Sequence, residues 1–96
     1  MQLGALLYEM EDLEGARELQ EKAYEGYKEK LGDDHQHTLT SMSNLGKLLK
    51  AMGDLEGAKD LFERCVAMRK EKLGESHPST INASEWLAIV TKKMEG

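Results

Sequence analysis

At 96 residues the chain is long enough for one small domain, and its abundance of Leu, Ala, Glu, Lys and Met with a single proline is typical of packed amphipathic helices. The formal net charge of −5 argues against nucleic acid as the main partner, because neutralising phosphates requires a dense basic surface. No apolar run approaches the roughly 20 residues of a membrane span, and no basic-then-apolar segment opens the chain. Cys65 is the single cysteine, so no internal disulfide is expected. We therefore expect an all-α, soluble, cytoplasmic protein without nucleic-acid or membrane partners.

A 42-residue repeat organises the chain. The pentapeptide Asp-Leu-Glu-Gly-Ala at positions 12–16 returns at 54–58. Three further features recur at the same spacing, namely Leu-Gly at 31–32 and 73–74, His35 and His77, and Thr38 and Thr80. Shifting the chain by 42 residues makes roughly 40 % of the overlapping positions identical, and a period between about 20 and 50 residues indicates a stacked-repeat architecture.

The first two expected helices lie in residues 2–31. Residues 2–10 carry apolar side chains at helical spacing, but this stretch is shorter than its later copy and looks truncated. Asp12 is then placed to cap a second helix, although Glu11 occupies the position that a glycine holds in the next repeat. A glycine at position 32 is expected to end this helix. The residues expected to form its buried stripe are Leu13, Ala16, Leu19, Ala23 and Tyr27.

Three more helices are expected at residues 38–52, 55–73 and 79–94, separated by short polar turns. Gly53 is expected to end the first of them and Asp54 to cap the second. The residues expected to face the core are Leu39, Met42, Leu45, Leu48, Leu49, Met52, Leu55, Ala58, Leu61, Phe62, Cys65, Val66 or Met68, and, in the last helix, Ile81, Leu87, Ala88, Val90 and Met94.

Five helices with tight turns make two and a half antiparallel hairpins of an α-solenoid. Residues 1–96 are expected to form one domain, with a truncated first repeat at 1–32, a complete second repeat at 33–74 and the first helix of a third at 75–96. The pattern starts and ends within a repeat, so we expect the chain to be a piece of a longer array.

Leu45-Gly46, followed by Ala58, Phe62 and the small Cys65, resembles the tetratricopeptide repeat (TPR) signature, in which small residues let two helices approach closely. The 42-residue unit has Leu-Gly-x-x-His-x-x-Thr in its connector and Gly-Asp-Leu-Glu-Gly-Ala at its inner turn, and in this it is similar to the kinesin-light-chain-like subtype. The resemblance implies a TPR-like solenoid that binds a protein or peptide partner without catalysis or cofactor. It does not identify that partner.

In such arrays the first helix of each hairpin lines the concave side, where partners dock. The residues that the resemblance places there are Tyr8, Ser43, Asn44, Lys47, Lys50, Asn82, Glu85, Trp86, Ile89 and Lys92. Helical geometry agrees for one stripe, because Ser43, Lys47 and Lys50 share a face. The lysines would favour an acidic partner, and the alternative for them is a solvated helix face.

Two of these residues have open alternatives. The resemblance implies that Asn44 hydrogen-bonds the backbone of an extended peptide, and the alternative is a surface or capping amide. Trp86, the only tryptophan, is either a binding anchor or a ring packed over the core.

The histidines and the cysteine do not predict a chemical site. His35, His37 and His77 lack a recognised metal-ligand spacing, and the repeat equivalence of His35 and His77 favours a shared structural role in the connectors. Cys65 replaces the small alanine of the signature and is expected to be a packed, inert thiol. We therefore expect neither metal nor cofactor, and no pattern of catalytic residues indicates an enzyme.

Two functions remain open at this point. The first is a protein-interaction module, a fragment of a longer scaffold or adaptor, that binds a partner segment on its concave face. The alternative is a structural unit that forms homo-oligomers through its uncapped terminal helices, because such arrays usually need capping repeats.

Overall fold

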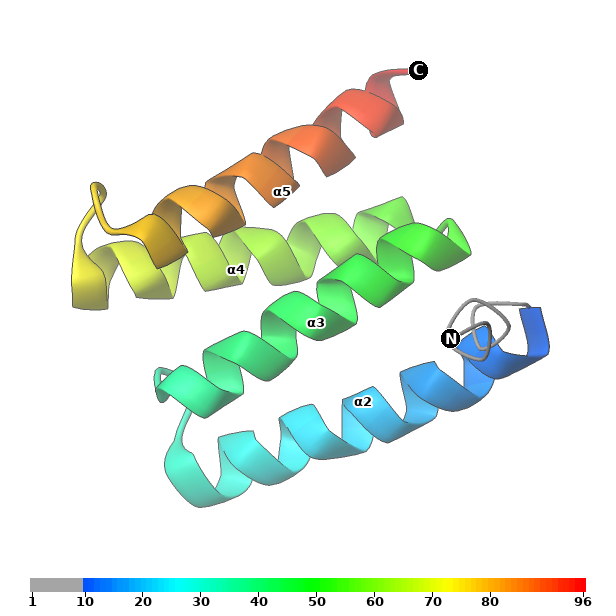
Figure 1. Ribbon diagram of the computed structural model, residues 1–96, viewed down its shortest axis with the longest axis horizontal. Coiled ribbons are helices and arrows are strands. Elements are labelled where there is room, and N and C mark those ends of the chain that lie inside the picture. Colours follow the sequence, from blue (N-terminus) through cyan, green and yellow to red (C-terminus); the bar gives the residue numbers. More distant parts are fainter. Residues whose placement is uncertain (1–9) are drawn as a thin grey trace, which may run out of the picture.

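The structure, a computed structural model, describes residues 10–96. It contains four α-helices, labelled α2 (Met10–Leu31), α3 (Gln36–Met52), α4 (Leu55–Leu73) and α5 (Pro78–Glu95). Consecutive helices run antiparallel and pack on one another, and α5 also touches α3 (Figure 1). No strand occurs in this part of the chain, so the prediction of an all-helical fold of stacked hairpins is confirmed.

The predicted number of helices does not match, because five were expected and the described residues form four. The expected first helix, at residues 2–10, lies outside the described residues except for Met10, which begins α2. The prediction that Asp12 caps the second helix is also wrong, since this residue lies inside α2. Gly53 occupies the position of Glu11 in the next repeat, and it adopts left-handed backbone angles (φ 90°, ψ 1°) that end α3. Glu11 carries a Cβ that disfavours this conformation, so the helix continues through it.

Histidines begin α3 and α5. The Nδ1 atom of His35 accepts a hydrogen bond of 3.0 Å from the backbone N–H of His37, and that of His77 accepts one of 3.0 Å from Ser79. These caps satisfy N–H groups that the first helical turn leaves free, so both helices begin earlier than residues 38 and 79. The prediction of a shared structural role for the two connector histidines is confirmed.

The core lies between α3, α4 and α5. Phe62, Met42, Cys65 and Val90 are fully buried there. The Sγ atom of Cys65 lies 3.7 Å from the backbone oxygen of Leu39, which places α4 directly against α3. These residues come from three helices, so a single apolar cluster holds the described hairpins together.

The predicted buried stripe of α2 is only partly correct. Leu13 is buried, whereas Leu19 is 70 % exposed and both Ala23 and Tyr27 are exposed. Tyr24, which was not predicted, faces α3 and is buried. Leu61 and Cys65 of α4 stand one repeat after Leu19 and Ala23, and both are buried against α3. No described helix covers the corresponding face of α2.

The predicted core face of α5 is also partly wrong. Ile81 and Met94 are 45 % and 40 % exposed, and Ala88 is exposed as well. The buried residues of α5 are Thr80, Ala83 and Val90, which fall on the side that packs against α4. Because α5 is covered mainly from this one side, its other apolar positions stay in contact with solvent.

Candidate functional site

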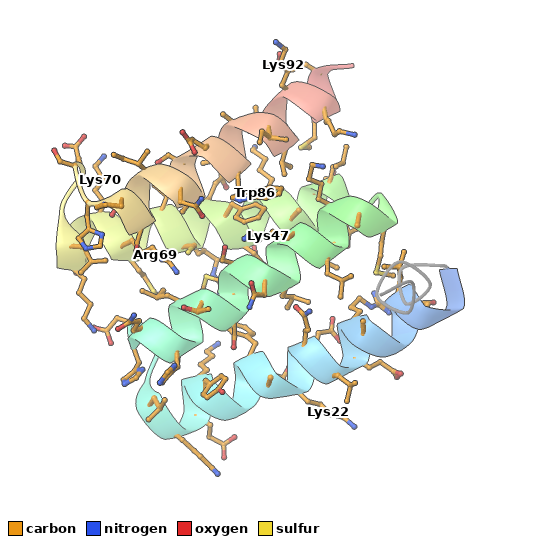
Figure 2. All side chains as sticks on the ribbon, viewed as in Figure 1. Lys22, Lys47, Arg69, Lys70, Trp86 and Lys92 are labelled. Carbon is orange, nitrogen blue, oxygen red and sulfur yellow. The ribbon has the colours of Figure 1, made fainter. Side chains whose placement is uncertain are left out.

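Two lysines and two aromatic rings meet where α3, α4 and α5 come together. The ring of Trp86 stacks on that of Phe62, with centroids 6.0 Å apart and planes inclined by 14°. On α3, the Nζ atoms of Lys47 and Lys50 lie 5.1 Å and 5.8 Å from the Trp86 centroid. Figure 2 shows Lys47 and Trp86 beside each other between α3 and α5. We call Lys47, Lys50 and Trp86 the lysine–tryptophan cluster; its geometry is that of cation–π contacts.

A cavity of about 530 Å³ opens beside this cluster, and we call it the connector cavity. It lies between the first halves of α3 and α5, with the end of α4 behind it and the two connectors at one end. Its lining includes His35, Thr40, Asn44, Lys47, Arg69, Lys72, His77 and Asn82. Lys47 belongs to both the cavity and the cluster, so the two form one continuous region of the surface.

The residues predicted for the concave face divide into three groups. Four line the connector cavity, namely Ser43, Asn44, Lys47 and Asn82. Of these, Ser43 is buried, and both asparagines are exposed. Lys50 and Trp86 are half-buried in the lysine–tryptophan cluster.

The remaining four predicted residues lie elsewhere. Glu85, Ile89 and Lys92 are exposed on α5 and do not line the cavity. Figure 2 shows Lys92 near the C-terminal end of α5, away from Lys47, Arg69 and Trp86. Tyr8 lies outside the described residues.

Two basic residues of the cavity were not predicted from the sequence. Arg69 donates a hydrogen bond of 3.2 Å from Nη1 to the backbone oxygen of Ser79, and Lys72 donates one of 2.8 Å from Nζ to that of Asp34. Arg69 thereby ties the end of α4 to the first turn of α5, and Lys72 ties it to the connector between α2 and α3. A sequence signal does exist, because both basic residues fall on one stripe of α4 and the solenoid brings both connectors to the same end.

The electrostatics of the cavity contrast with those of the whole chain. Lys47, Arg69 and Lys72 face a single carboxylate among the lining residues, that of Asp34. The chain as a whole has a formal charge of −5, so positive charge is concentrated in this hollow. Such a surface attracts anionic groups.

The buried thiol behind the cavity is not a reactive group. Burial raises the pKa of Cys65 above its ordinary value of 9.0, and the nearby Arg69 guanidinium only partly opposes this effect. A thiol with a raised pKa stays protonated at neutral pH, and the thiolate is the nucleophilic form. The observed burial agrees with the expected packing role of this cysteine.

Comparison with known proteins gives a family. The model of the tetratricopeptide repeat matches residues 1–71, which is most of the chain. No curated protein matches the sequence. None of the described helices is both long enough and apolar enough to cross a membrane.

Proposed function

The chain belongs to the tetratricopeptide repeat family, and we propose that it is a non-catalytic module that holds an acidic, extended segment of a partner protein between α3 and α5. TPR repeats are in general protein-interaction modules. The observation that carries the proposal for this chain is the lysine–tryptophan cluster, which combines an aromatic surface with two cations beside a cavity.

The cluster offers a short acidic peptide both an apolar surface and charged contacts. Trp86 is half-buried and supported from below by Phe62, so its ring is a rigid apolar surface of the kind enriched at binding hot spots. Lys47 and Lys50 hold their ammonium groups over this ring and can turn to a carboxylate of the ligand. Asn44 lines the same hollow, and its amide can donate to and accept from a peptide backbone.

The fluorescence of Trp86 gives a direct test, because it is the only tryptophan. Acidic and neutral peptide pools are titrated into the protein, and the acidic pool is expected to bind. The double variant Lys47→Glu with Lys50→Glu should bind acidic peptides at least about tenfold more weakly, since two charge contacts become repulsive. The matched control is Lys22→Glu with Lys30→Glu on exposed positions of α2, which makes the same charge change.

Far-UV circular dichroism and thermal unfolding establish that all variants remain folded. Equal loss of affinity in the α3 and α2 variants would contradict binding between α3 and α5, because it would mean that only the overall charge of the protein matters. Binding of neutral and acidic peptides with the same affinity would contradict the acidic preference.

We extend the proposal to a scaffold or adaptor fragment of the kinesin-light-chain-like subtype that acts in the cytoplasm. The support is the 42-residue unit and its connector motif, Leu-Gly-x-x-His-x-x-Thr. Fluorescence microscopy of the tagged chain tests the location, and enrichment on membranes would contradict it. Isolation of a partner that itself carries cargo or an enzyme would support the adaptor role, and repeated isolation of free peptides alone would oppose it.

The exposed face of α2 favours a second candidate function, self-association. Leu19, Ala23 and Tyr27 lie on one side of this helix and are all exposed. Light scattering over a wide concentration range should then detect a discrete oligomer that the variant Leu19→Glu dissociates. The control is Lys22→Glu on the same helix. A protein that remains monomeric throughout would rule this function out.

A further inference from the structure

Hydrogen-bond donors outnumber acceptors on the wall of the connector cavity. Lys47 comes from α3, and Arg69 and Lys72 come from the last turns of α4. His35 and His77 add one ring each from the two connectors. The donors thus approach one hollow from several elements that are far apart in the sequence.

The helix caps determine which nitrogen of each histidine is left to act as a donor. In both rings Nδ1 accepts the backbone N–H two residues later. A neutral imidazole has one acceptor nitrogen and one N–H, so the proton is on Nε2. His35 and His77 therefore each offer an Nε2–H group while they cap their helices.

The two basic residues of α4 are held in position before any ligand binds. Arg69 uses one N–H for the backbone oxygen of Ser79, and Lys72 uses one for that of Asp34. A guanidinium has five N–H groups and an ammonium has three, so most of their donors remain free. Groups fixed in this way lose little further entropy when an anion binds.

We propose that the connector cavity is a phosphate-binding site that receives a phosphorylated side chain of the partner segment. This inference rests on the proposed function and names the chemical class of the ligand group that the connector cavity would bind. Three cations and one carboxylate leave two positive charges, which match a phosphate dianion. The available donors also exceed what one carboxylate can accept, and a guanidinium binds phosphate oxygens in pairs.

The first test uses inorganic phosphate, added at constant ionic strength against chloride and followed by NMR of the His37 and Ser79 amides. These amides bond directly to the two cavity histidines. Saturable shifts are expected, with affinity about fivefold weaker in Lys72→Gln. Lys70→Gln is the matched control, because Lys70 lies in the same turn of α4, is exposed and does not line the cavity (Figure 2).

The second test uses a short blocked alanine peptide with one central phosphoserine, together with its serine and glutamate counterparts. The phosphoserine peptide should bind at least about tenfold more tightly than either counterpart, and Lys72→Gln should reduce this preference. Arg69→Lys keeps the charge but removes the planar pair of donors, so it should lower the preference for phosphate as well.

Several results would overturn the proposal. Shifts that do not saturate, or equal weakening in Lys70→Gln and Lys72→Gln, would show only general charge attraction. Binding of inorganic phosphate without binding of the phosphoserine peptide would mean a small-anion site rather than a peptide site. If unphosphorylated acidic peptides bind through Lys47 and Lys50 regardless of Lys72, the proposed function stands and the phosphate site is excluded.

Discussion

The ring of Phe62 on α4 lies directly against the backbone of Gly46 on α3. A Cβ atom added to Gly46 would lie 2.9 Å from Cζ of Phe62, closer than such atoms approach in proteins. Phe62 is fully buried, and its ring stacks on that of Trp86 in the lysine–tryptophan cluster. The absence of a side chain at Gly46 therefore determines how closely α4 packs on α3 and where the Trp86 ring of α5 lies.

Gly46→Ala is expected to destabilise the protein by about 1 kcal/mol or more, because overpacking outweighs the gain in helix propensity. Gly15→Ala on α2 is the matched control. Nothing lies within 4 Å of a Cβ at that helical position, so this variant should be about 0.5–1 kcal/mol more stable than the parent. Urea unfolding measures both, and stabilisation by Gly46→Ala would refute the close approach.

Leu61 and Leu19 occupy the same position of successive repeats but differ in burial, at 7 % and 70 % exposed. Leu61→Ala should cost about 2–5 kcal/mol of unfolding free energy, because it leaves a cavity between α3 and α4. Leu19→Ala should change it by less than about 0.5 kcal/mol. A comparable loss in both variants, measured by urea unfolding at low protein concentration, would show that this face of α2 is covered in solution.

His35→Ala should destabilise the protein by about 1 kcal/mol, because the N–H of His37 loses its capping acceptor. His35→Asp should restore most of the loss, since aspartate is a good N-cap residue. The control is His37→Ala, which removes an exposed ring that accepts no capping bond. Thermal unfolding compares the three variants, and an equal loss for the two alanine variants would argue against the cap.

Because the thiol of Cys65 is buried, we expect the free energy of unfolding to fall at alkaline pH. Burial raises the pKa of its thiol in the folded state above 9.0, so the folded protein keeps a proton that the unfolded chain releases. The stabilisation is fully present below about pH 9 and disappears as the pH rises from there through the folded pKa. Urea unfolding between about pH 8 and 10.5 should therefore show a steeper decline for the parent than for Cys65→Ala. Parallel declines would contradict this prediction.

Much of the fold could be predicted because it depends on local patterns. The 42-residue period, the turn glycine Gly53, the capping Asp54 and the small–large pair of Gly46 and Phe62 are all visible in the sequence. The shared face of Lys47 and Lys50 was predicted for the same reason, since helical spacing places both residues on one side of α3. The turn glycine, the cap and the lysine positions were predictable because neighbours along the chain set them. The pairing of Gly46 with Phe62 joins two helices, and it was predictable through the resemblance to the TPR signature.

The sequence by itself determined that this chain is a stack of helical hairpins with a repeated polar connector. Only the tertiary structure decided that Leu61 is buried while its equivalent Leu19 is exposed, because burial depends on whether another helix covers a given face. It also decided that Arg69 reaches the first turn of α5, that Lys72 reaches the connector before α3, and that both line the cavity with Lys47. Residues so far apart in sequence meet only through packing, which local spacing does not encode.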